Sequence, residues 1–246
     1  MYIRVPFHFN PIRELEWMIR TLGIFKRHKI PIEEKAHALH LYMAGLSSWE
    51  IADAMEDHYG RKPSHSSVLN WARALGSVGW TIPPRERRLI AVDETVERVN
   101  GREVYAWAAM DVDTGELLAI KASWSSGPVV QWSRSPMDAL LFLRRALGAR
   151  TDKPVFVVDR GPWYSWAFRG LGLQYYRGAF GDRSGVERSF GSLKRRTRVF
   201  FKDINARRSR IASLDMLMNL SFVYYNGLRF HKGIGRVPSE VIAVLG

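Results

Sequence analysis

The sequence predicts a mixed α/β fold that follows a small all-α module. This prediction depends on where the hydrophobic periodicity changes along the 246 residues. Up to residue 76 the chain shows short helical patterns, each of which ends at a glycine. From residue 87 the pattern becomes that of β-strands, rich in β-branched and aromatic residues. A chain of this length can bury one good core and a small second module.

The all-α module is predicted from three consecutive helical patterns, over residues 32–45, 47–60 and 64–76. Ser47 and Glu50 have the spacing of a capping box, and Ser64 is a candidate N-cap. The Gly-Leu-Ser turn between the first two patterns fits a helix-turn-helix. The third pattern carries a polar face that suits contact with DNA bases, formed by Ser66, Asn70 and Arg73. A small helical bundle used for protein contacts is the alternative interpretation.

The α/β region begins with three predicted strands, over residues 87–99, 102–112 and 116–124. They are separated by Asn100-Gly101 and by Asp113-Thr114-Gly115, both strong hairpin signals, so we expect an antiparallel meander. A helix, a buried strand, a helix, a strand and two helices follow, over residues 137–148, 153–161, 163–172, 173–180, 181–200 and 208–230. This order of elements describes a mixed sheet with flanking helices, an α/β layer fold of the RNase H type.

The clearest boundary lies in residues 76–88, where two glycines and a Pro-Pro pair interrupt the pattern. We therefore expect four segments: an N-terminal helical extension over 1–30, a helix-turn-helix DNA-binding domain over 31–77, a linker over 78–87 and a catalytic α/β domain over 88–246.

The formal net charge of +13 is concentrated in the last quarter of the chain. Residues 186–246 hold 12 basic and 4 acidic side chains, an imbalance that favours a polyanionic partner, nucleic acid first. The sequence contains no cysteine, which excludes disulfides and thiolate metal sites. We see no signal peptide of ordinary form and no run as long as a membrane span, so we expect a cytoplasmic, nucleoid-associated chain with no membrane partner.

Three acidic residues are candidates for one site. Asp93 lies within an apolar strand, where a carboxylate is costly to bury unless a cation or a proton compensates it. Asp159 ends a buried strand, at the edge where open α/β sheets bind their ligands. Glu187 stands in the first turn of a helix that we expect to pack across the same sheet. Together they predict a carboxylate site.

Each acid also has a structural interpretation. Glu187 stands three residues after Ser184, the spacing of a capping box. Asp159 stands just before Gly-Pro and could set a turn, and Asp93 could be a partly exposed edge residue. Asp111 and Asp113 flank a hairpin turn and are expected to be turn residues. Glu94 and Glu97 are expected either to face solvent or to support the site.

Three carboxylates in a cleft suit Mg²⁺ or Mn²⁺ rather than zinc. Two such ions form the arrangement that catalyses in-line phosphoryl transfer. Glu187, Gly191, Lys194 and Arg198 fall on one stripe of the predicted helix. The basic residues expected to hold DNA phosphates are Lys194, Arg195, Arg196 and Arg198.

Several motifs resemble those of the DDE transposases of prokaryotic insertion sequences. They are "VDET" with Asp93, "VVDRGPWY" with Asp159, "VERSFGSLKRRTRVF" with Glu187 and the closing "YYNGLRFHKGIGRVPSEVI". The resemblance covers about residues 85–246, and the base Lys194, seven residues after Glu187, is a specific part of it. The interval from Asp159 to Glu187 is shorter than the superfamily usually has, which leaves Asp182 as an alternative third acid.

The resemblance implies an integrase-core, RNase H-like catalytic domain that binds element ends and, with Mg²⁺ or Mn²⁺, cleaves and transfers DNA strands. It also implies multimeric assembly on double-stranded DNA, with no small-molecule substrate. A DNA-binding regulator or silenced relative without catalysis is the alternative from another class. A nuclease that cuts without joining is a third interpretation.

Overall fold

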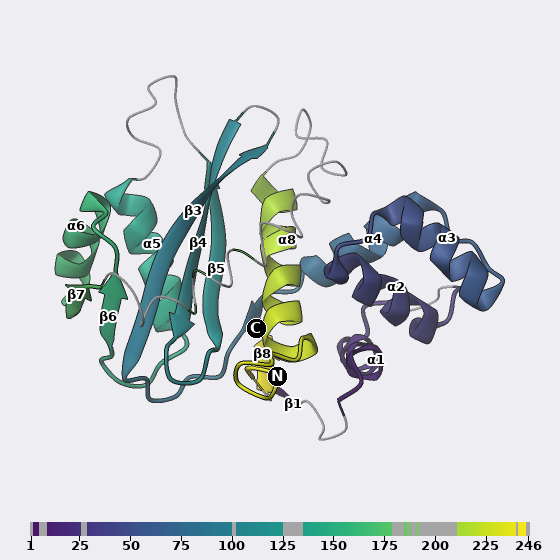
Figure 1. The fold of residues 1–246 in the computed structure, drawn as a ribbon, viewed down its shortest axis with the longest axis horizontal. Helices are drawn as coiled ribbons and strands as arrows, with labels where there is room; N and C mark the ends of the chain where they lie inside the picture. Colours follow the sequence, from purple (N-terminus) through teal and green to yellow (C-terminus); the bar gives the residue numbers. More distant parts are fainter. Residues whose placement is uncertain are drawn as a thin grey trace. The chain divides into compact units, whose positions relative to one another are not determined.

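The computed structural model describes residues 2–4, 9–25, 29–99, 102–124, 135–178, 185, 187, 191, 211–239 and 241–244. Contacts divide the chain into two compact units. Unit 1 comprises Met1–Trp80 and Leu193–Gly246, and unit 2 comprises Thr81–Ser192. Figure 1 shows the elements of both units, coloured along the sequence. The four predicted segments stay a prediction, because compactness does not test whether a segment folds by itself.

The N-terminal part of unit 1 is helical, as predicted. Its helices are α1 (Pro11–Leu22), α2 (Ile32–Ala44), α3 (Ser48–Tyr59) and α4 (His65–Gly76). Ser47 and Glu50 form the predicted capping box on α3, and the Ser64 side chain caps α4 by accepting from the Ser67 N–H. Gly45 ends α2 with a φ of 110°, a left-handed conformation that favours glycine. The predicted helix limits are therefore confirmed in this module.

The C-terminal elements of unit 1 pack with these helices. They are α8 (Ile211–Val223), the π-helical turn η1 (Tyr224–Leu228) and strand β8 (Val241–Val244). Strand β8 pairs antiparallel with β1 (Tyr2–Arg4), in a three-stranded sheet of order β1-β8-β2, where β2 is Trp80–Thr81. Helix α4 contacts α8, and the Asn219 side chain donates to the Gly76 carbonyl at 2.8 Å. Unit 1 therefore joins the two ends of the chain.

Unit 2 is built on a five-stranded sheet of order β5-β4-β3-β6-β7. The strands are β3 (Leu89–Val99), β4 (Arg102–Asp111), β5 (Leu117–Trp124), β6 (Val155–Val158) and β7 (Tyr175–Arg177). The first three form the predicted antiparallel meander, while β6 is parallel to β3 and β7 is parallel to β6. This mixed sheet with its flanking helices confirms the predicted RNase H-like class.

Helices α5 (Pro136–Leu147) and α6 (Pro162–Leu171) cover one face of this sheet (Figure 1). The ring of Trp107 on β4 lies 6.0 Å from Phe142 of α5 and 6.0 Å from Tyr164 of α6, centroid to centroid. All three side chains are almost completely buried. Their aromatic packing fixes the helices on this face. Among the described helices, none is long and apolar enough to cross a membrane.

A buried ion network holds the start of β3 against the β4–β5 hairpin. Arg87 is only 1% exposed; its guanidinium donates to Asp111 at 2.5 Å and also pairs with Glu116. Asp111 was expected to be a turn residue, and its other oxygen does accept from the Asp113 N–H at 3.0 Å. Its burial was not predicted from the sequence, because its partner Arg87 belongs to the predicted linker.

Candidate metal centre

The candidate centre lies where β3 and β6 run side by side. In their parallel register Ala91 pairs with Val157, so Asp93 and Asp159, each two residues further along, reach the same level. Asp93 lies inside the long strand β3 and is 9% exposed, whereas Asp159 directly follows the end of β6 and is half-buried. The strand pairing therefore brings together two acids that are 66 residues apart.

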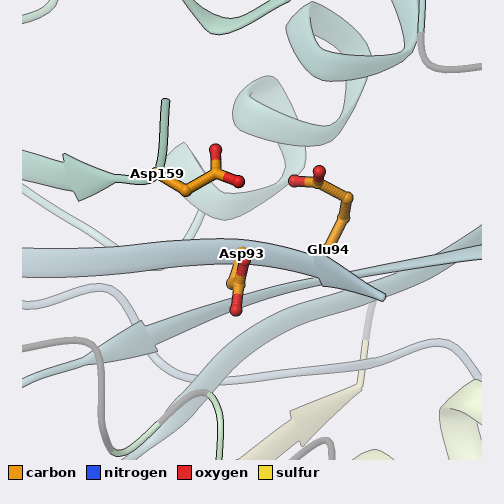
Figure 2. A group of neighbouring side chains, drawn as sticks. All are labelled: Asp93, Glu94 and Asp159. Atoms are coloured by element: carbon orange, nitrogen blue, oxygen red, sulfur yellow. The ribbon is translucent and has the colours of Figure 1, made fainter. Parts of the chain in front are cut away.

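A third carboxylate joins them. Asp93, Glu94 and Asp159 each place one oxygen so that the three atoms lie within 4.8 Å of one another, and we call these residues the carboxylate cluster. Figure 2 shows the side chains of Asp159 and Glu94 pointing toward each other, while that of Asp93 leaves β3 in another direction. The donor set consists of hard carboxylate oxygens alone, which fits Mg²⁺ or Mn²⁺.

The loop after β6 fixes the orientation of Asp159. Its carboxylate accepts from the Gly161 N–H at 2.8 Å, and Pro162 then starts α6. A Cβ at position 161 would lie 2.5 Å from the Trp163 ring, so a larger residue there would require this ring to shift. The turn that was considered as an alternative role for Asp159 is therefore present. It also fixes the orientation of the Asp159 carboxylate.

Glu94 was expected to face solvent or to support the site, and the first of these is wrong. The side chain is half-buried, and its Oε2 accepts from the Tyr164 hydroxyl at 2.5 Å. Burial, followed by the charge of Glu94, raises the pKa of Tyr164 well above its ordinary value, with Asp159 and Asp93 adding to the shift. The hydroxyl therefore keeps its proton and remains a donor. The position of Glu94 next to Asp93 places it on the opposite face of β3, but no sequence pattern showed that this is the face covered by the helices.

Glu187 is helical and exposed, and it is not a member of the carboxylate cluster. Its neighbour Gly185 lies close to the sheet, because a Cβ there would be 2.9 Å from the Met110 sulfur on β4. Met110 pairs with Ala91, so Gly185 lies over the face to which Asp93 belongs, opposite the face of Glu94. The metal-ligand role of Glu187 stays a prediction.

The predicted DNA-binding residues fall into two groups. Ser66, Asn70 and Arg73 are all exposed on α4, and the Arg73 guanidinium donates to the Asn70 side-chain oxygen at 2.9 Å. We call these three residues the α4 face. The basic group lies outside the described residues: Lys194, Arg195, Arg196 and Arg198. The DNA-binding role of both groups stays a prediction.

Fold and site together define an RNase H-like α/β protein with a cluster of three carboxylates beside its central strand. The chain belongs to the same family as the uncharacterized protein MJ0017 of Methanocaldococcus jannaschii, with which it is 37% identical over 178 residues, 72% of this chain and 78% of that protein. A second relative, the uncharacterized protein aq_aa24 of Aquifex aeolicus, is 46% identical over 48 residues, 20% of this chain and 40% of that protein. No protein-family model matches the chain.

Among solved structures, the catalytic core domain of HTLV-2 integrase in complex with magnesium matches 63% of this chain and 96% of its own, with a TM-score of 0.45 and 13% identity. The match to the catalytic core domain of BIV integrase covers 61% of this chain and 90% of that domain, with a TM-score of 0.42 and 20% identity. The match to the chain in the Mos1 strand transfer complex covers 89% of this chain and 85% of that chain, with a TM-score of 0.32 and 12% identity. Likenesses this distant carry no inference about activity, and the fold class stands on the strand order described above.

Proposed function

We propose that the chain is a transposase that binds the ends of an insertion sequence and performs metal-dependent DNA strand cleavage and strand transfer. The observation that carries this proposal is the approach of the three cluster oxygens within 4.8 Å of one another, beside the parallel pair β3 and β6. Three close carboxylates repel one another unless a proton or a cation compensates them. A divalent cation is the compensation that fits an all-oxygen donor set.

In the proposed site, Asp93 and Asp159 bind the metal, and Glu187 completes the set from the helix that carries Gly185. The support for Asp93 and Asp159 is their place in the carboxylate cluster. The support for Glu187 is its motif and the position of Gly185 over the sheet face of Asp93. The proposed site holds two Mg²⁺ or Mn²⁺ ions. When bound, such ions make the attacking oxygen more nucleophilic and neutralise the charge that develops on the leaving oxygen.

The proposed reaction has two steps. Water attacks a phosphorus at the element end; the new P–O bond forms as the bond to the 3′ oxygen breaks, which leaves a 3′ hydroxyl and a 5′ phosphate. That 3′ hydroxyl then attacks a phosphorus of the target DNA and displaces a 3′ oxygen there. The turn at Gly161 holds the Asp159 carboxylate ready for both steps, because its hydrogen bond to the backbone restricts the side chain.

The proposed partner is double-stranded DNA, both element end and target, bound by an oligomer of this chain in the cytoplasm. The α4 face would read terminal sequence, since its amide and guanidinium are exposed and adjacent. Lys194, Arg195, Arg196 and Arg198 would contact phosphates, since their charge belongs to the most basic quarter of the sequence.

The test is nicking by the full chain of a labelled duplex taken from the DNA that flanks its gene, with Mg²⁺ and with EDTA. We expect Mg²⁺-dependent nicking that Asp93→Asn or Asp159→Asn lowers by orders of magnitude, while both variants melt and bind DNA like wild type. Specific DNA binding with no nicking in Mg²⁺ or Mn²⁺ would instead identify a DNA-binding regulator.

Glu187→Gln tests the third ligand in the same assay. Glutamine keeps the length of glutamate and is accepted at the same position of a capping box, but it lacks the negative charge that a divalent cation requires. We expect a normal melt, retained DNA binding and nicking reduced by orders of magnitude. Asp182→Asn is the matched control and should nick like wild type. Wild-type nicking by Glu187→Gln would remove Glu187 from the site, and a loss only at Asp182 would reassign the third acid.

A further inference from the structure

Tyr164 connects the first turn of α6 to the carboxylate cluster. Its ring is 1% exposed and lies edge-on to Trp107, at 6.0 Å between centroids, and 6.1 Å from Phe168. These contacts leave the ring little freedom, so the position of the hydroxyl is fixed. The hydroxyl donates to the Oε2 of Glu94 at 2.5 Å.

The partner carboxylate lies on the covered face of the sheet. Glu94 directly follows Asp93 in β3, so the two side chains leave opposite faces of the strand. Across the β3–β4 pair Glu94 is opposite Trp107, whereas Asp93 is opposite Ala108. Glu94 therefore belongs to the aromatic face beneath α6, where a carboxylate without hydrogen bonds would be costly. The Tyr164 hydroxyl satisfies one of its oxygens there.

The carboxylates of the cluster repel one another, so the hydrogen bond from Tyr164 also affects the orientation of Glu94 within the cluster. Glu94 and Asp159 point toward each other (Figure 2), and one oxygen of each lies within 4.8 Å of an oxygen of Asp93. Without a restraint, a glutamate side chain would turn away from two other carboxylates. A neutral donor such as the Tyr164 hydroxyl can hold one oxygen of Glu94 in place without adding a charge to the cluster.

We propose that Tyr164 is a positioning residue that holds Glu94 beside Asp159, so that Glu94 takes part in binding the divalent cation. This inference rests on the proposed metal-dependent function and adds to it two residues that the three-acid assignment omits. Residues that hydrogen-bond a metal ligand set its orientation, and their loss commonly weakens metal binding. The alternative is that the contact only ties α6 to β3.

The test compares two Tyr→Phe variants of the full chain. Tyr164→Phe removes the hydroxyl and keeps the buried ring. Tyr175→Phe is the matched control, because its hydroxyl also bonds to α6, at 3.1 Å from the Ser165 Oγ, and its ring also packs on Phe168, at 4.5 Å. The measurements are the Mn²⁺ dissociation constant without DNA, by calorimetry, and the melting temperature without metal. We expect Tyr164→Phe to weaken Mn²⁺ binding about 10–100-fold and Tyr175→Phe to leave it unchanged.

Glu94→Gln is the second variant and decides the question if Tyr164→Phe does not fold. Glutamine still accepts from the Tyr164 hydroxyl but lacks the charge, so Mn²⁺ binding should also weaken. In the double variant the effect of Tyr164→Phe should largely disappear, because the two residues act through one carboxylate. Wild-type Mn²⁺ affinity in either single variant, with or without a lower melting temperature, overturns the inference but leaves the proposed function intact. Failure of the wild-type chain to bind Mn²⁺ overturns both.

Discussion

Several side chains in this chain form their ion pairs and hydrogen bonds with residues that are distant in sequence. Arg87 illustrates this, because its guanidinium is buried between Asp111 and Glu116, while its backbone N–H donates to the Asp152 carboxylate at 3.0 Å. A buried cation of this kind is costly to remove, since Asp111 then remains buried without its cation, whereas Glu116 still pairs with Arg85. Tyr164 and Glu94 show the same dependence at the candidate metal centre.

Arg87→Met should therefore strongly destabilise the fold. Methionine fills part of the same volume but leaves the buried Asp111 carboxylate without its cation, for an expected loss of about 3–5 kcal/mol in the free energy of unfolding. The neighbouring Arg88 is the matched control, because it pairs with Asp113 at the surface, where the two side chains are 70% and 43% exposed. Arg88→Met should cost less than about 1 kcal/mol.

Urea unfolding of the two variants measures the difference. Equal losses at Arg87 and Arg88 would show that burial adds nothing to the Arg87 pair. The predicted result would show that the segment before β3, interpreted as a linker from its sequence, is part of the core of unit 2.

Among the elements, α4 has one buried apolar surface and one exposed polar surface. Its inner surface buries Val68, Ala72 and Leu75, and its outer surface is the α4 face of Ser66, Asn70 and Arg73. The hydrogen bond between Arg73 and Asn70 presents an amide and a guanidinium side by side, the groups that pair with adenine and guanine edges. This pair supports the proposed reading of bases by α4.

Asn70→Ala and Arg73→Ala should each reduce the preference of the full chain for its flanking DNA over random duplex by about 1–3 kcal/mol. The measurement is the ratio of the two dissociation constants at fixed salt. Arg61→Ala is the control, since Arg61 is an exposed base outside the α4 face that pairs with Glu34. It should weaken binding to both duplexes alike. An unchanged ratio in the Asn70 and Arg73 variants would exclude sequence reading by α4.

At the scale of the whole molecule, unit 1 is assembled from the two ends of the chain. Tyr2–Arg4 pairs with Val241–Val244, and Gly76 at the end of α4 packs against Met216 of α8. Contacts between such distant segments form only after a large loss of chain entropy, so close packing must compensate it. A fragment of residues 31–77 would lack the α8 surface that covers Gly76, and DNA binding is therefore better tested in the full chain.

Gly76→Ala tests this contact. A Cβ at this position would lie 2.3 Å from the Met216 Cγ and 2.8 Å from its carbonyl oxygen, so α8 would have to shift. Such overpacking should cost about 1–3 kcal/mol and lower the melting temperature. Gly170→Ala near the end of α6 is the matched control, because its Cβ would meet Leu140 at an ordinary 3.5 Å. That variant should melt at or slightly above the wild-type temperature, as alanine favours helix. Equal melting temperatures of the Gly76→Ala and Gly170→Ala variants would contradict the close packing at Gly76.

The features that were predicted correctly from the sequence are those that local chemistry controls. Periodicity, hairpin turns and caps specified the meander β3–β5, the helices α2–α4 and the exposure of Ser66, Asn70 and Arg73, because each depends on residues a few positions apart. An apolar strand around Asp93 and another before Asp159 were enough to select two acids of the carboxylate cluster. The place of Glu94 in this cluster, its hydrogen bond with Tyr164 and the burial of Arg87 were not predictable from the sequence and follow from the folded arrangement. Those outcomes depend on strand register and on which helix covers which sheet face, and both are set by contacts between segments that no local pattern encodes.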